Sequence, residues 1–380
     1  MSSRRSHGEG SIYQRSDGRW VATLRDGQKR VTRYARSQQD ARKALQKMHR
    51  EREHGVLGDN SQKLRDFLRR WYSHQEQRLR PRTLESYDDI IRLHLEPTLG
   101  HIPLGKLTPQ HVQDVLDDRL KRGLSARRVL HIRAVLRTAL NQAMRWEIVH
   151  RNVALAVEPP RVGVEKRPRA LTEAEARALL KAAQEKPGGS IWLVILALGL
   201  RRGEAAGLQW KDVDLTGGEI SIRRSLQRIR GHWEEQPTKT GRERVIALPD
   251  FALRALEQRQ AEQQLEAAQA GADWQGERWG HLVWASPDGT PLDSRRLWDS
   301  LQVIAAEAGI GALRVHDLRH SAASLMLAAG VPVVEVAAVL GHSQPSTTAN
   351  IYAHVLASRQ RRAADTIHAL LAGGQGEEAP

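Results

Sequence analysis

The sequence contains no cysteine, and its apolar runs are short. Without a thiol the chain can form no disulfide, use no thiolate nucleophile and bind no zinc or iron–sulfur cluster through Cys. The longest apolar run, 191–200, has ten residues, about half of what a bilayer-spanning helix needs. The opening Met-Ser-Ser-Arg-Arg-Ser has no apolar segment behind it, as a secretory signal would. These absences predict a soluble, cytoplasmic protein with no membrane partner.

Basic residues outnumber acidic ones, and the formal net charge is +15. The excess lies early in the chain: residues 1–55 hold 14 basic and 6 acidic residues, and residues 56–165 hold 19 and 13. Residues 166–380 are almost neutral, with 26 and 25. A basic front part beside a neutral remainder indicates a module that binds a polyanion, joined to one with another task. A merely solvated basic surface is the alternative until motifs are considered.

The first 57 residues read as a small strand–helix domain. Residues 9–36 alternate between polar and apolar side chains and are interrupted by turn sequences at 16–18 and 26–27, which predicts three short strands. A helix is expected from Ser37, as N-cap, to about His54. This unit is too small to be an enzyme by itself.

Residues 62–157 read as a helical domain, with apolar residues at helical spacing in Leu64, Phe67, Leu68 and Trp71. Further helices are expected at 108–122 and 125–147. Several arginines fall on the exposed faces of this bundle, which favours contact with phosphates. They are Arg127, Arg128, Arg133, Arg137 and Arg145.

Residues 158–169 contain three prolines and no periodicity, and they are predicted to form an extended linker. The third domain, 170–372, opens with a capping box of Thr172 and Glu175. Strands are expected at 219–223 and 244–248, joined by a turn-rich stretch at 231–241. Helices are expected at 173–185, 190–199, 204–208, 250–269, 294–308, 317–329, 333–340, 347–355 and 359–371. The tail 373–380 is predicted to be disordered, and the fold class is mainly α with small β elements (α+β).

Four separated motifs lie in this third domain: Leu198-Gly-Leu-Arg-Arg-Gly-Glu, Pro237-Thr-Lys-Thr-Gly before a strand, His316-Asp-Leu-Arg-His, and Leu340-Gly-His with Tyr352 ten residues later. Together they resemble the boxes of the tyrosine recombinases, specifically the phage-type integrases. The resemblance implies an active site of Arg201, Lys239, His316, Arg319, His342 and Tyr352, with Glu204 in support. It also implies that 1–57 is an arm-type DNA-binding domain, 62–157 a helical core-binding domain and 170–372 a mixed α/β catalytic domain.

The same resemblance implies a site-specific recombinase that cuts and rejoins double-stranded DNA through a 3′-phosphotyrosyl intermediate, without cofactor or metal. The expected assembly is a homotetramer on attachment or crossover sites of a mobile element, and a DNA-bending or excision helper protein is a further partner that such a system can use. A type IB topoisomerase-like relaxing enzyme and a non-catalytic DNA-binding regulator are the alternatives.

Phosphodiester chemistry by itself favours these residue types. In-line attack builds negative charge on the non-bridging oxygens, and arginines such as Arg201 and Arg319 offer fixed, fork-shaped donors for it. Tyr352 is the only tyrosine after Tyr87, and a phenol of pKa about 10 needs a base or cations nearby to attack. Lys239 is the only lysine after Lys211, and a lysine can protonate a leaving oxygen where arginine is a poor acid.

His316 and His320, spaced by four residues, also raise the possibility of a zinc site. The glutamate of a His-Glu-x-x-His pattern is missing and Arg319 stands between the two, so no metal is predicted. In the recombinase interpretation His316 accepts a proton or binds phosphate, and His342 donates to a phosphate oxygen. His320 and His354 are expected to be structural, and Glu204 to orient Arg201.

The end of the chain predicts an amphipathic helix. Its apolar positions are Ala363, Ala364, Ile367, Leu370 and Leu371. A helix this short must bury its stripe, either on its own domain or on a neighbouring protomer. The resemblance favours the neighbour, which would link the subunits on DNA.

Overall fold

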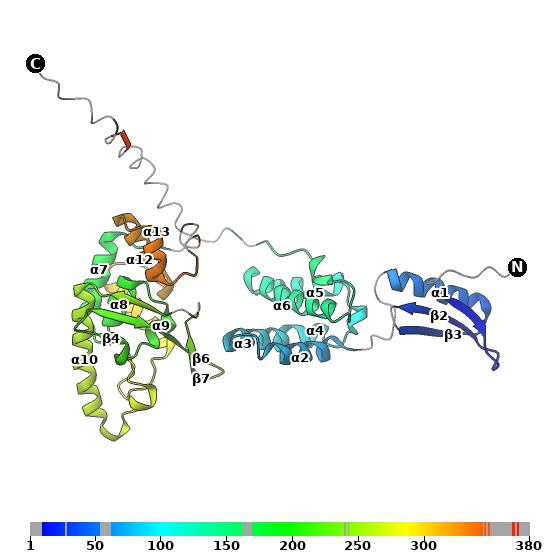
Figure 1. The fold of residues 1–380 in the computed structure, drawn as a ribbon, viewed down its shortest axis with the longest axis horizontal. Helices are drawn as coiled ribbons and strands as arrows, with labels where there is room; N and C mark the ends of the chain where they lie inside the picture. Colours follow the sequence, from blue (N-terminus) through cyan, green and yellow to red (C-terminus); the bar gives the residue numbers. More distant parts are fainter. Residues whose placement is uncertain are drawn as a thin grey trace, which may run out of the picture. The chain divides into compact units, whose positions relative to one another are not determined.

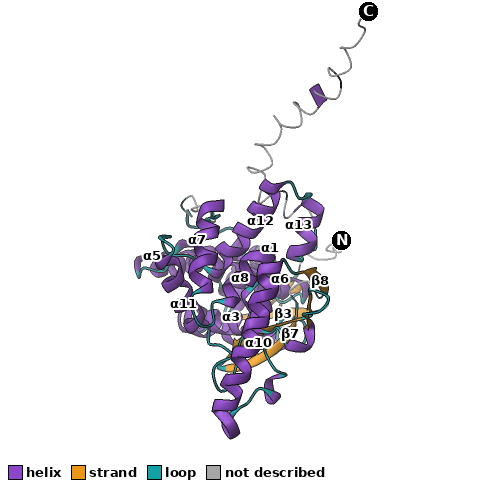
Figure 2. Cartoon of the chain, turned by 90° about the vertical axis from the view of Figure 1, so that its left-hand side faces the viewer, coloured by secondary structure: helices purple, strands orange, loops and turns teal. Residues whose placement is uncertain are grey.

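The computed structural model describes residues 10–26, 29–53, 62–161, 163, 169–238, 241, 243–344, 346, 349, 367, 368 and 371. The chain divides into two compact units, Met1–Glu165 and Lys166–Pro380. Helices dominate both and the sheets are small (Figures 1 and 2), which confirms the predicted fold class. No helix among the described residues is long and apolar enough to cross a membrane.

The N-terminal part is a three-stranded antiparallel sheet with one helix. Strands β1 (Ser11–Gln14), β2 (Trp20–Asp26) and β3 (Lys29–Ala35) lie in the order β1-β2-β3, and α1 (Gln38–Glu53) follows. Alternate strand residues such as Ala22 and Leu24 pack against Ala41 and Met48 of the helix. The Ser37 hydroxyl accepts a hydrogen bond from the Asp40 amide at 3.1 Å, as an N-cap should.

Residues 62–161 form a helical bundle with its own apolar core. It contains α2 (Leu64–Gln75), α3 (Pro81–Ile90), a π-helical turn η1 (Ile91–Leu95), α4 (Glu96–Leu99), η2 (Leu104–Lys106), α5 (Pro109–Lys121), α6 (Ala126–Arg145) and η3 (Val153–Leu155). The predicted apolar face of α2, including Phe67 and Trp71, is fully buried. Thr108 and Ser125 cap α5 and α6 at the predicted starts.

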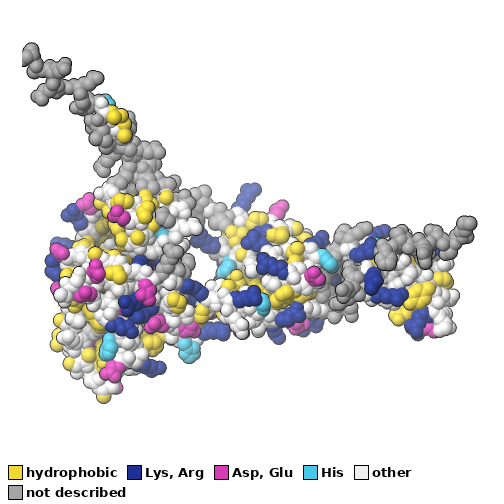
Figure 3. Space-filling model, in the orientation of Figure 1, with side chains coloured by type: hydrophobic (Ala, Val, Ile, Leu, Met, Phe, Trp, Pro, Cys, Tyr) yellow, Lys and Arg dark blue, Asp and Glu magenta, His cyan; other side chains and the backbone are white. Residues whose placement is uncertain are grey.

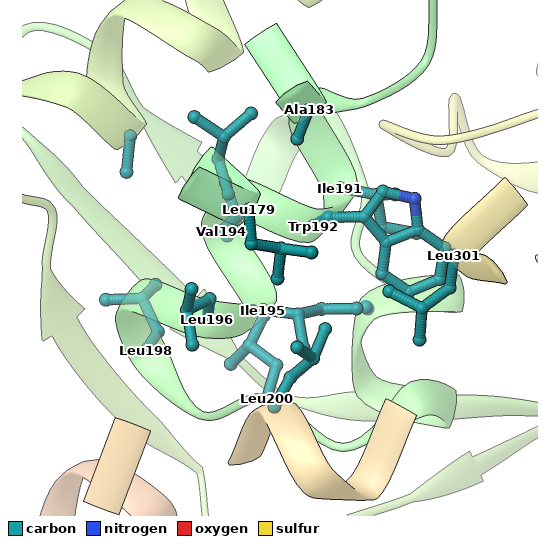
Figure 4. Packing of buried hydrophobic residues seen from close by; sticks show 14 of the residues in the cluster. Leu179, Ala183, Ile191, Trp192, Val194, Ile195, Leu196, Leu198, Leu200 and Leu301 are labelled. Carbon is teal, nitrogen blue, oxygen red and sulfur yellow. The ribbon is translucent and has the colours of Figure 1, made fainter. Parts of the chain in front are cut away.

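The second unit surrounds one buried helix, α8 (Ser190–Leu198). Its other helices are α7 (Glu173–Gln184), α9 (Arg202–Ala206), α10 (Asp250–Ala270), α11 (Ser294–Glu307), α12 (Val315–Ala329) and α13 (Val333–Leu340), with 3-10 turns η4 (Trp210–Asp212), η5 (Gly271–Asp273) and η6 (Glu277–Trp279). Almost every side chain of α8 is buried, and Trp192 packs near Leu301 (Figure 4). The apolar run 191–200 is therefore the centre of a soluble-type core.

A small antiparallel sheet in the order β4-β5-β8 covers part of this core, formed by β4 (Val213–Asp214), β5 (Glu219–Ile222) and β8 (Arg244–Ala247). A separate hairpin pairs β6 (Arg224–Ile229) with β7 (His232–Pro237). No strand was predicted at 224–229, and the prediction of only a turn-rich stretch at 231–241 was wrong, because β7 lies within it. Its strands are mostly polar, so no alternation marked them. Leu226 and Trp233 pack with Ala206 of α9, which holds the hairpin against that helix.

Other boundaries differ by a few residues. Helix α9 begins at Arg202 rather than 204, and α12 begins at Val315 rather than 317. In both cases an acidic side chain three residues after the N-cap accepts a hydrogen bond from the N-cap amide, which starts the helix earlier. The capping box at Thr172 is confirmed for α7. The helices predicted at 347–355 and 359–371, and the tail 373–380, lie almost wholly outside the described residues.

Candidate active site

The site begins where α8 ends. Gly199 has φ +63° and caps the helix in the left-handed conformation, where glycine is favoured. A Cβ at this position would also lie 2.4 Å from Leu340 Cδ2, so a larger residue would have to displace that buried side chain. Two residues later Arg201 takes an extended backbone (φ −72°, ψ 147°) as the N-cap of α9. The helix end and the glycine together place this guanidinium beside the end of α13.

Glu204 fixes the orientation of Arg201. Its carboxylate accepts the Arg201 backbone N–H at 3.0 Å and the Arg201 Nη1 at 2.7 Å. Only 1% of the Glu204 side chain is exposed. Burial raises the pKa of this carboxyl, but hydrogen bonds and charges from Arg244, and then from Arg201, hold the pKa below its ordinary value. Glu204 is therefore ionised at neutral pH, and it makes the contact with Arg201 that was predicted for it.

Arg319 is buried between two helix ends. Its Nη1 donates to the Gly199 carbonyl at 2.6 Å and its Nη2 donates to the Leu340 carbonyl at 2.7 Å. Arg201 reaches the same place from α9, since its Nη2 donates to the Gly341 carbonyl at 3.3 Å. Arg319 lies in α12, and the Leu340 and Gly341 carbonyls lie at the end of α13. Figure 1 shows these two helices beside each other near α8.

Three histidines surround the two arginines. Burial, followed by the charge of Arg319, lowers the pKa of His316. Burial, followed by the charges of Arg319 and Arg201, lowers the pKa of His342 to about 4. The ring of His320 stands edge-on to that of His316, with centroids 4.6 Å apart, and burial and His316 lower its pKa to about 4. At neutral pH all three imidazoles are neutral, and a neutral imidazole has one nitrogen of the accepting type and one N–H of the donating type.

The structure thus brings together four of the six predicted catalytic residues: Arg201, His316, Arg319 and His342. Lys239 and Tyr352 lie outside the described residues, and their places stay predictions. Within the described ranges, no group of three or more His, Asp or Glu side chains could hold a metal ion. Sequence reasoning treated Arg244 only as the first residue of a strand, although it contacts Glu204. Its partners lie 40 and 95 positions away, and no local pattern signals such contacts.

Two fixed guanidinium groups beside neutral imidazoles suit a tetrahedral anion such as a phosphate. Arg201 keeps 24% of its side chain exposed, so it can reach a ligand, whereas Arg319 is 3% exposed. Guanidinium groups hold negative charge without titrating, and neutral imidazoles can move protons near neutral pH. The arrangement is suited to stabilising a phosphorane-like transition state while a proton is exchanged.

The neutral histidines predict how stability depends on pH. Because His320 and His342 have a pKa of about 4 in the folded chain and about 6.5 when unfolded, the unfolded chain binds more protons between those values. The free energy of unfolding should therefore be largest above about pH 6.5, and it should fall as the pH decreases towards 4. Thermal melting between pH 7.5 and 5 measures this, and His320→Asn with His342→Asn should flatten the slope. His150→Asn, at an exposed position, should leave it unchanged, and a flat wild-type profile would contradict the burial argument.

Comparison with known proteins identifies the family. The model of the Phage integrase family matches residues 169–359, and that of the phage integrase N-terminal SAM-like domain matches residues 63–119. An integrase of Streptomyces ambofaciens is 29% identical over 93% of this chain and 94% of its own length. An integrase of Saccharopolyspora erythraea is 24% identical over 96% of this chain and 97% of its own.

Solved structures show the same fold. A lambda integrase tetramer bound to a Holliday junction superposes with a TM-score of 0.60, at 20% identity, over 92% of this chain and 96% of that chain. The Tn1549 transposon integrase in complex with a circular intermediate DNA gives a TM-score of 0.66, at 17% identity, over 80% of this chain and 100% of that chain. Neither the topoisomerase-like nor the regulator alternative is favoured. Because the first family model spans half of the chain and every described residue of the site, the chain belongs to the phage integrase family, as a tyrosine recombinase that breaks and rejoins DNA strands.

Proposed function

We propose that this recombinase integrates or excises a mobile element through a phosphotyrosine made by Tyr352. The observation that carries the proposal is the convergence of Arg201, His316, Arg319 and His342 at the ends of α8 and α13. These four residues come from three separate motifs, so their meeting is a property of the fold and not of one local pattern.

In this mechanism the Tyr352 oxygen attacks the scissile phosphorus. The bond to the 5′-oxygen breaks, and the DNA keeps its 3′-phosphate on tyrosine. Neutral His316 accepts the phenolic proton, and Lys239 donates one to the leaving 5′-oxygen. Arg201 and Arg319 offset the charge on the non-bridging oxygens, and His342 donates a hydrogen bond to one of them. Rejoining reverses each step with the 5′-hydroxyl of another strand, so the phosphodiester energy is retained and neither ATP nor metal is required.

Trapping the covalent intermediate tests this proposal. The protein is incubated with its flanking genomic DNA carrying a nick near the crossover site, so that the short 5′-hydroxyl fragment diffuses away and rejoining fails. We expect a covalent adduct that survives denaturation and maps to the peptide containing Tyr352, and a chelator should leave it intact. An adduct on another residue, or one abolished by the chelator, would contradict the proposed chemistry.

We further propose a division of labour along the chain. Residues 1–57 bind arm-type DNA sites, 62–157 bind the core site, and 158–169 link this module to the catalytic domain at 170–372. Support for the core-binding role comes from exposed arginines on α6, including Arg127, Arg137 and Arg145. Figure 3 shows Lys and Arg side chains spread over this part of the chain. Such a surface is suited to phosphate contacts.

The open face of the N-terminal sheet supports the arm-binding role. Tyr13, Val21 and Tyr34 are opposite one another in the register, so they share the face away from α1. Arg25 and Arg30 are paired on the same face. The Arg30 guanidinium donates to the Thr23 hydroxyl at 3.4 Å. On this face Tyr13 and Tyr34 are exposed, whereas Val21 between them is buried. Exposed tyrosine and arginine side chains are suited to contact with a DNA backbone.

Removing the charges of this sheet face tests whether it, and not another part of the domain, binds DNA. Arg25→Gln with Arg30→Gln should weaken arm-site binding and make the slope of log K against log salt shallower by about 1–2, because each lost phosphate contact removes about 0.9. Deleting residues 1–55 should abolish arm-site binding while cleavage at the crossover site stays measurable. Filter binding between 50 and 300 mM salt, chosen as roughly the range where such slopes are resolved, measures both.

A control variant of equal charge lies on the helix side of the same domain. Lys43→Gln with Lys47→Gln removes two exposed charges from α1 and should leave the arm-site slope nearly unchanged. If the helix pair and the sheet pair reduce the slope equally, the sheet is not the binding face.

We also propose that the protein works as a homotetramer on DNA in the cytoplasm. The lambda integrase structure is a tetramer on a Holliday junction, and the two chains share a fold. Of the predicted C-terminal apolar stripe, the described residues Ile367 and Leu371 are exposed in the single chain, as a segment that docks on a neighbour would be. Light scattering on DNA complexes tests this: truncation after Val355 should remove tetramers and leave single protomers bound.

A further inference from the structure

We propose that Arg244 is a positioning residue for strand cleavage, holding Arg201 and His342 in register by tying Glu204 to the end of α13. The inference rests on the proposed function, because it concerns the same active site. Arg244 lies at the start of β8, five positions after Lys239, and it is not one of the six predicted catalytic residues.

The first support is the pairing of Arg244 with Glu204. The two terminal nitrogens of Arg244 donate to the two oxygens of the carboxylate, Nη1 to Oε1 at 3.3 Å and Nη2 to Oε2 at 2.8 Å. The same two oxygens receive Arg201. Glu204 therefore lies between two guanidinium groups, and its position depends on both.

The second support is the contact with α13. Arg244 Nε donates to the Val339 carbonyl at 2.8 Å, close to the end of that helix. A Cβ at Gly341 would lie 2.8 Å from Arg244 Nη1, so the chain passes directly over the guanidinium. Gly341 has φ +65° and precedes His342. Arg244 thus lies under the turn that presents His342, while Arg201 donates to the Gly341 carbonyl from the other side.

The third support is burial. The Arg244 side chain is 10% exposed, against 24% for Arg201. Its Nε, Nη1 and Nη2 all have partners within the protein. A guanidinium engaged in this way does not need to touch a phosphate to matter, because displacing the reacting groups by about 1 Å can cost about a hundredfold in rate. Its role is to keep other groups in place.

The chain offers a matched control in Arg259 of α10. Arg259 Nη1 and Nη2 donate to the two oxygens of Glu266 at 2.7 Å each, and its Nε donates to the Val283 carbonyl at 3.1 Å. Its side chain is 4% exposed. This is the same bonding pattern, in a buried place that none of the site contacts involves. A stability effect should appear in variants of both arginines, and a cleavage effect only in variants of Arg244.

The test compares Arg244→Lys with Arg259→Lys. Lysine keeps the charge but cannot bridge two carboxylate oxygens and a carbonyl at once. Arg244→Lys should bind crossover DNA as the wild type does and form the covalent adduct about ten to a hundred times more slowly in single-turnover reactions. Arg259→Lys should lose melting temperature to a similar extent and keep the wild-type cleavage rate.

A second substrate separates positioning from general loosening of the fold. A methylphosphonate at the scissile position lacks one charged oxygen, so cleavage depends less on Arg201. The defect of Arg244→Lys should shrink on this DNA, whereas a loosened fold would slow both substrates equally. Equal defects on both substrates, or wild-type rates on normal DNA, would overturn the inference.

Three further outcomes have defined meanings. If Arg244→Lys does not fold, Glu204→Gln weakens the same link from its other end and carries the same comparison of substrates, with the same expected result. If the wild type forms an adduct through Tyr352 while Arg244→Lys and Glu204→Gln both cleave normally, the inference fails and the proposed function stands. If the wild type forms no adduct, both fail.

Discussion

Tyr352→Phe is expected to bind crossover DNA with wild-type affinity and to form no covalent adduct. The substitution removes one oxygen, which is the nucleophile, and it leaves the ring and the net charge unchanged. Because the adduct needs this oxygen for its new bond to phosphorus, the loss should be complete rather than partial. The measurement is the adduct band on nicked DNA after denaturation, with binding followed separately by mobility shift.

The control removes a hydroxyl from a tyrosine elsewhere. Tyr72→Phe, in α2 of the helical bundle, should retain full adduct formation. An adduct formed by Tyr352→Phe, joined to another residue, would show that the nucleophile was misassigned. Since Tyr352 lies outside the described residues, this experiment is also the direct test of the role predicted from its motif.

Arg201→Lys should slow cleavage by about a hundred- to a thousandfold, the range found when one preorganised donor to a developing oxyanion is lost. Lysine retains the charge but loses the fork that contacts Glu204 and the Gly341 carbonyl together. Because the Arg201 side chain is partly exposed, the melting temperature should change little. Single-turnover cleavage and thermal melting, measured on the same preparation, test the two statements.

Arg319→Lys provides the contrast. This guanidinium is buried and bonded to two carbonyls, so its replacement should reduce both cleavage and melting temperature. Leaving buried carbonyls without donors costs about 1–3 kcal/mol each. If Arg319→Lys were as stable as the wild type, Arg319 would have no structural role besides its role at the phosphate. If Arg201→Lys were strongly destabilised, Arg201 would not serve the ligand alone.

Helix starts and core faces could be predicted from the sequence because their causes are local. Ser37 and Thr172 cap the helices that they were expected to cap. Thr108 and Ser125, predicted only as helix starts, cap α5 and α6. Helical spacing likewise identified the buried face of α2. In each case the deciding interactions lie within one turn, so a few neighbouring residues carry the signal.

The remaining features depend on contacts between distant parts of the chain. The hairpin β6–β7 is polar and is held by the small cluster around Leu226 and Trp233, so its sequence lacks a strand pattern. The partners of Arg319 lie 120 and 21 positions away. Those of Arg244 lie 40 and 95 positions away. Motif resemblance supplied the residue types of the site, but only the fold gives the hydrogen bonds that orient them.

Arg319 occupies the carbonyl of Gly199, which caps the end of α8, and the carbonyl of Leu340, the last residue of α13. No amide of their own helices can reach these carbonyls. Each helix end carries about half a negative charge, so it attracts a cation even before DNA arrives. Arg319 therefore closes two helices besides serving the reaction. A descendant of this protein that no longer cut DNA would be expected to lose Arg201 freely, yet to retain Arg319 for as long as it folded. A homologue that keeps Arg319 without Arg201 would therefore have kept the fold but not the activity.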